Sequence, residues 1–164
     1  MNTATESSSS VDQAKLNTEM CMGRLLKTLS FVPDDKLDWS PAQGCKSPLR
    51  IAAHCGVSNG NFIKIMKRIP FPEMKPEEMM AMAEAAETAV TSREQAVSLV
   101  EESCKRVFET LDSLSPEEVD SLVETRFFTA PMVFWMNLPA RHMDNHAAQI
   151  DLLQTCWGDY DWHM

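Results

Sequence analysis

Two histidines near the C-terminus, His142 and His146, have a spacing that lets both bind one ion. Residues four apart on a helix lie on the same face, about one turn from each other. The same stripe continues through residues that we expect to be buried, namely Gln149, Ile150, Leu153 and Trp157. Two imidazoles on an otherwise apolar face predict a divalent metal site whose third ligand comes from another part of the chain.

A third histidine, His54, lies in a predicted helix beside an apolar surface. Three neutral imidazoles suit Zn, Ni, Co or Fe. Three protein ligands also leave one coordination position of the ion open, as in catalytic metal sites. At that position the ion can acidify a bound water or bind a thiolate. Ser58 and Asn61 follow His54 on its stripe and are possible pocket residues, although ordinary polar helix positions would look the same.

Other interpretations of these histidines differ in how well they fit the sequence. A lone HxxxH pair often arises by chance, and the histidines would then be ordinary polar surface residues. A metalloprotease needs Glu directly after the first histidine, but Met143 stands there, and Asp144 lies about 200° around the helix. Cys55 lies about 100° from its neighbour His54, which places the two poorly for a Cys–His nucleophile pair. No general base can be identified, so the catalytic residues are unassigned.

The composition excludes several classes of partner. The net charge of −9 disfavours binding to nucleic acid or to an anionic membrane surface, and no apolar run approaches the roughly 20 residues that span a membrane. The five cysteines form no CxxC pair, and no secretory segment is evident, which favours reduced thiols in the cytoplasm. Cys45 stands in a polar loop before a helix and is the cysteine that we expect to be exposed and reactive.

Hydrophobic periodicity predicts four long helices in one domain of residues 11–164, after a disordered tail of residues 1–10. The second helix begins after the cap Ser47 and runs to about Arg68. Its Gly56 and Gly60 weaken it, but their spacing can let a neighbouring helix approach closely.

The later elements are marked by prolines and helix caps. A proline-rich connection leads to a short helix from Pro76, and Thr91 is predicted to cap the third long helix. A second cap at Ser115 predicts one helical turn, and residues 121–129 fit either a short extended strap or a loop. The last helix should cover residues 130–157 as one helix, kinked at Pro139.

Three segments together resemble the DinB/YfiT-like metalloenzyme family, and the similarity extends over residues 11–158. They are Val32–Pro41, Ser47–His54 and Arg141–Gly158. The resemblance implies an all-α four-helix bundle with a long crossover between helices two and three. It implies that His54, His142 and His146 are a metal triad, usually for nickel or zinc, that the protein is a homodimer, and that it does not bind DNA. Ala147 departs from the polar residue frequent in relatives, which predicts a different pocket wall.

Some members of that family are transferases that use a low-molecular-weight thiol. Together with the three histidines, this favours a divalent-metal-dependent enzyme, either a thiol-dependent transferase or a hydrolase, acting on a small molecule. One alternative is a non-catalytic helical bundle that binds a metal or a small ligand. Another is an interaction protein with vestigial histidines, which would hold no stoichiometric metal. An open coordination position beside a solvent-reachable pocket distinguishes the enzyme from the binding module.

Overall fold

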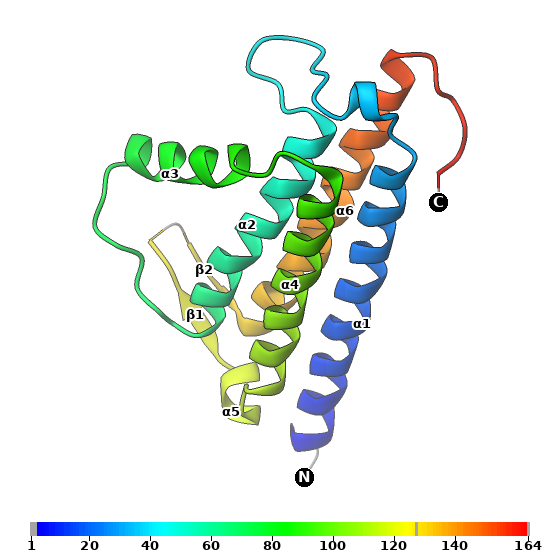
Figure 1. The fold of residues 1–164 in the computed structure, drawn as a ribbon. Coiled ribbons are helices and arrows are strands. Elements are labelled where there is room, and N and C mark those ends of the chain that lie inside the picture. The colour runs from blue at the N-terminus through cyan, green and yellow to red at the C-terminus, as the bar shows by residue number, and fades with distance from the viewer. Residues whose placement is uncertain (1–2, 127, 164) are drawn as a thin grey trace.

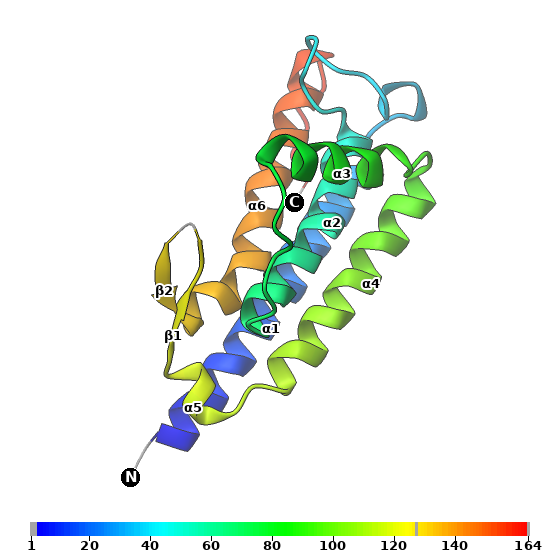
Figure 2. The ribbon, with the colours of Figure 1, turned by 90° about the vertical axis from the view of Figure 1, so that its left-hand side faces the viewer.

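The computed structural model describes residues 3–126 and 128–163 and shows a bundle of four long helices (Figure 1). They are α1 (Thr3–Ser30), α2 (Pro48–Met66), α4 (Arg93–Asp112) and α6 (Met132–Cys156). The other elements are η1 (Asp34–Lys36), α3 (Pro76–Thr88), α5 (Pro116–Val119), β1 (Leu122–Glu124) and β2 (Thr129–Pro131). The all-α bundle is confirmed, and the long crossover between α2 and α4 contains α3, which lies across the bundle (Figures 1 and 2). None of the described helices has both the length and the apolar character that a membrane crossing needs.

The N-terminal segment differs from the predicted disordered tail. Helix α1 begins at Thr3 and not at Val11. The first ten residues contain no proline or glycine, so nothing in their covalent structure stops the helix from extending. Residues 1–2 of the predicted tail lie outside the described residues, and the domain limits of 11 and 164 stay a prediction.

The helix ends follow their local signals closely. The hydroxyls of Ser47 and Ser115 cap α2 and α5 as predicted, each accepting a backbone N–H three residues on. The predicted cap of α4 at Thr91 is wrong by one residue, because the hydroxyl of Ser92 accepts the N–H of Gln95. Thr91 instead donates its own N–H to the Gln95 side chain at 2.7 Å. Either residue type is a favourable cap, so sequence alone does not choose between two adjacent ones.

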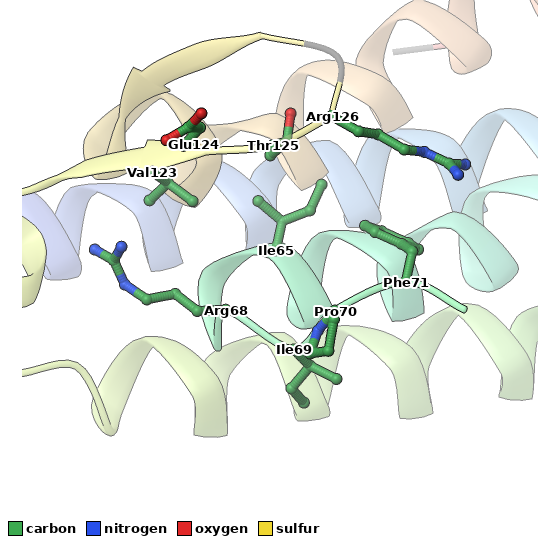
Figure 3. Close-up of a pocket in the computed structure, with 9 residues that line it drawn as sticks. All are labelled: Ile65, Arg68, Ile69, Pro70, Phe71, Val123, Glu124, Thr125 and Arg126. Carbon is green, nitrogen blue, oxygen red and sulfur yellow. The ribbon is translucent and has the colours of Figure 1, made fainter. Parts of the chain in front are cut away.

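The segment of residues 121–129 contains β1 and the first residue of β2, and the two strands pair as a short antiparallel hairpin. It is tied to the end of α2 by Arg68, whose guanidinium donates to Ser121 Oγ at 2.6 Å and to the Leu122 carbonyl at 3.3 Å. Arg68 has a φ of 54°, in the left-handed region that ends many helices. A cavity of about 400 Å³ lies between the hairpin and the connection that follows α2, with Ile65 between the two (Figure 3).

Helices α2 and α4 approach closely at Gly56, as predicted, but not at Gly60. A Cβ atom on Gly56 would lie 2.6 Å from Leu99 Cγ and 3.2 Å from the Leu99 carbonyl oxygen, whereas one on Gly60 would meet nothing within 4 Å. We therefore expect Gly56→Ala to lower the free energy of unfolding by about 1–3 kcal/mol. The control Gly60→Ala should raise it by up to about 1 kcal/mol, because alanine favours the helix. Urea unfolding measures both, and equal effects at the two positions would contradict the close packing.

Candidate metal centre

The three predicted ligands converge where α2 and α6 pack together. One nitrogen from each of His54, His142 and His146 lies within 4.8 Å of the other two. The Nε2 atoms of His142 and His146 are 3.1 Å apart, and the ring of His54 lies 5.0 and 4.9 Å from the other two rings, measured between centroids. The structure therefore brings His142 and His146, which are four residues apart, together with His54, which lies about ninety positions earlier in the chain.

The histidine pair lies at the edge of the buried face of α6. The core side of this helix is formed by Met143, Ala147 and Ile150, none of which is exposed, while the histidines are half-buried. The prediction that Gln149 would be buried is wrong, since it is exposed beside His146. The predicted effect of Ala147 on the pocket wall is also corrected, because this side chain packs in the hydrophobic core and not beside the imidazoles.

The donor chemistry fits one divalent ion. His54 Nδ1 lies 2.7 Å from a carboxylate oxygen of Glu87, and His146 Nδ1 lies 2.8 Å from the amide oxygen of Gln149. Each oxygen accepts the Nδ1 proton, which leaves the Nε2 lone pair of that ring free for a metal. Bonds of about 2.0–2.1 Å place adjacent nitrogens of a tetrahedral zinc ion about 3.4 Å apart. The observed separation of 3.1 Å is close to this value, and the third nitrogen needs only a small side-chain movement.

The electrostatics keep the α6 pair neutral. Burial, reinforced by the charges that His146 and His54 would carry, lowers the pKa of His142 to about 3, and burial also lowers the pKa of His146. Neutral imidazole is the form that binds a metal. His142 Nδ1 is buried and has no hydrogen-bond partner among the described residues, and Phe62 packs edge-on against the ring at 5.3 Å.

Glu87 is the residue beside the candidate centre that sequence reasoning missed. It is 2% exposed, and it is the one buried residue of α3, all of whose residues are described. Its carboxylate accepts hydrogen bonds from Lys46 and from His54, and Arg50 Nη2 lies 3.5 Å away. Burial opposes ionisation, but the hydrogen bonds from Lys46 and His54 outweigh it and hold the pKa of Glu87 below its usual value. Helix α3 contains four glutamates, and nothing in their spacing marks this one.

The remaining predicted residues lie around the triad without joining it. Ser58 is buried on α2, one turn after His54, whereas Asn61 is exposed and lines a separate cavity between α2 and α3. Cys45 is exposed, as expected, but Cys156 is exposed as well, and the reactivity of Cys45 stays a prediction. Cys55 is fully buried in the core, and burial raises the pKa of its thiol, so it is unsuited to act as a nucleophile beside His54.

Comparison with solved structures shows the same fold in two proteins of low sequence identity to this chain. A mycothiol-dependent maleylpyruvate isomerase superposes with a TM-score of 0.69 at 16% identity, over 85% of this chain and 60% of the isomerase, and a mutant of that isomerase gives 0.70. This chain therefore spans about three fifths of the isomerase. A DinB-like protein from Bacillus subtilis superposes with a TM-score of 0.65 at 13% identity, over 93% of this chain and 96% of that protein.

Comparison with curated proteins gave no match. The model of one protein family, the DinB superfamily, matches residues 17–150. That range contains all three histidines of the candidate centre and most of the bundle that positions them. Together with the shared fold, the match shows that the chain belongs to the DinB superfamily.

Proposed function

We propose that this protein is an enzyme that depends on a divalent metal, nickel or zinc, and acts on a small molecule with the help of a low-molecular-weight thiol. The observation that carries the proposal is the convergence of three imidazoles within 4.8 Å at a half-buried position. The His54 side chain is 26% exposed, so one of the three rings is in contact with solvent. A bound ion would lower the pKa of a coordinated thiol or water.

The residues at the candidate centre would have three roles: ligands of the ion, groups that orient the ligands, and a cation, Lys46, at the edge of the site. His54, His142 and His146 would hold the ion, while Glu87 and Gln149 orient two of the rings through their Nδ1 atoms. The Lys46 side chain is 36% exposed, and its charge is near enough to His146 to contribute to the lowered pKa of that residue. A cation in this position attracts an anionic thiol or a carboxylate substrate toward the open side.

The similarity to a mycothiol-dependent isomerase supports a thiol partner in particular. Transfer of a group to or from that thiol is the reaction that we favour, with hydrolysis as the second reaction class. The five cysteines are all unpaired, in keeping with a reducing compartment, and we place the protein in the cytoplasm as a homodimer. The alternative function is non-catalytic binding of the metal or of a small ligand by the same three histidines.

Cobalt substitution tests the thiol-dependent function. Protein purified without a histidine tag and loaded with Co²⁺ should bind about one ion per chain. Adding 2-mercaptoethanol should then change the visible and near-ultraviolet absorption, because a thiol that reaches the open side alters the surroundings of the cobalt. Ethylene glycol, the matched alcohol, should leave the spectrum unchanged. Stoichiometric cobalt with no response to thiol would favour the non-catalytic alternative, and the failure of the folded protein to bind Co²⁺, Zn²⁺ or Ni²⁺ would reject both.

A further inference from the structure

We propose that a second site, the groove between α2 and α3, binds a small molecule that has an apolar body and an anionic group. The groove encloses about 330 Å³. Its walls include Phe71 and three methionines, Met74, Met79 and Met82, and its lining also includes Lys64 from α2 and Arg106 from α4. None of the three histidines lines this groove, so the proposal does not depend on the metal or on the proposed enzymatic function.

The volume and the lining suit a small molecule. Ligand sites in proteins measure about 300–1,000 Å³ and are mostly apolar, with a few polar groups that fix orientation. Methionine side chains adapt their shape to an apolar ligand. Helix α3 buries only Glu87, so its methionines are not used to build the core, and Met82 remains 61% exposed. Because α3 crosses in front of α2 (Figure 2), it forms one wall and limits the occupant to a compact molecule.

The charge of the groove selects an anion. The chain carries 24 acidic and 15 basic residues, yet none of the residues that line this groove is acidic. Lys64 Nζ lies 5.9 Å from the centre of the Phe71 ring, and no carboxylate of the described residues pairs with Lys64 or Arg106. Arg24, by contrast, contacts two aspartates. Two cations without acidic partners beside an apolar wall match a carboxylate or sulfonate on a hydrophobic body.

The groove also borders the candidate metal centre. Val57, which lines it, lies one helical turn after His54, and Ala86, on its other wall, directly precedes Glu87. A ligand in the groove would therefore contact the helix that positions Glu87. Because none of the three histidines contributes to the lining, binding can be measured in protein treated with a chelator.

Two fluorescent probes with nearly the same aromatic body test the proposal. We expect anilinonaphthalenesulfonate, which is anionic, to bind the metal-free protein at one saturable site, and neutral phenylnaphthylamine to bind roughly tenfold more weakly. Lys64→Glu and Arg106→Glu should each weaken the anionic probe by roughly tenfold and change the neutral probe little. Lys105→Glu is the matched control, since this residue precedes Arg106 on α4 but does not line the groove.

A substitution that fills the groove provides a second, independent test of the proposal. Ala83 lines it from the partly exposed side of α3, so Ala83→Trp should weaken both probes while far-ultraviolet circular dichroism stays unchanged. The proposal is overturned if Ala83→Trp leaves the affinity for the anionic probe intact, because the probe then binds elsewhere. It is also overturned if the two charge reversals have no effect, or if Lys105→Glu has the same effect as they do, because the attraction is then not local.

Discussion

Replacing His146 with alanine is expected to reduce the bound metal from about one ion per chain to a trace. The variant loses one of three converging ligands, and the loss of a direct ligand should exceed the 10–100-fold weakening that removal of an outer partner causes. Helix content should change little, because Met143, Ala147 and Ile150 pack the core side of α6 without help from His146. Elemental analysis of untagged protein and circular dichroism measure the two quantities.

His163→Ala is the matched control for that experiment. His163 lies in the C-terminal segment, where its ring stacks on Phe31 and its Nε2 lies 2.9 Å from an Asp159 carboxylate oxygen, so it should not affect the metal content. Full metal content in His146→Ala would show that the triad is not the site. Complete unfolding of that variant would mean that the metal, or the imidazole itself, is structural.

Glu87→Ala is expected to weaken metal binding by about 10–100-fold, although Glu87 is not a ligand in the proposed centre. Without the carboxylate, the His54 ring loses the oxygen that holds its Nδ1 proton, and Lys46 loses its buried partner. Glu87→Gln keeps an oxygen for His54 and should retain much of the affinity. Titration with zinc against a competing chelator measures the change, and the absorption spectrum of the cobalt-loaded protein reports whether the surroundings of the ion alter.

Glu84→Ala provides the control on the same helix. Glu84 is exposed and has a 3.7 Å contact with Arg50, so it tests the general loss of a negative charge from α3. An affinity for zinc in Glu87→Ala equal to that of the unmodified protein would rule out a positioning role. Equal losses in the alanine and glutamine variants would assign the effect to the charge and not to the oxygen that faces His54.

The parts of the fold that depend on local sequence could be predicted well. Ser47 and Ser115 cap helices as expected, and α6 continues through Pro139 as a single helix. Trp39, a large side chain in the loop that precedes α2, packs edge-to-face on Trp157 with ring centres 5.4 Å apart. These features follow from hydrogen-bonding and packing preferences that act over a few residues or on one large side chain.

The parts of the site that depend on tertiary packing could not be predicted in the same way. The proximity of His54 to the α6 pair depends on the register between two helices, which sequence spacing does not report. The apolar surface beside His54 suggests this proximity, and the family resemblance supports it. Glu87 reaches His54 only because α3 lies across α2. The hairpin was ambiguous because its strands, β1 and β2, have three residues each, too few to establish an alternating pattern.

The burial of Cys55 has a consequence for competition between metals. This thiol follows His54 in sequence, yet it lies in the core, and its raised pKa keeps it protonated at neutral pH. Among the described residues, the converging donors are therefore imidazoles alone, with no thiolate. Soft ions such as cuprous copper, mercury and cadmium gain most from thiolate ligands, whereas zinc and nickel are well served by imidazole. By keeping its sulfur out of reach, Cys55 would limit the advantage of toxic soft metals at a site that lies one residue away.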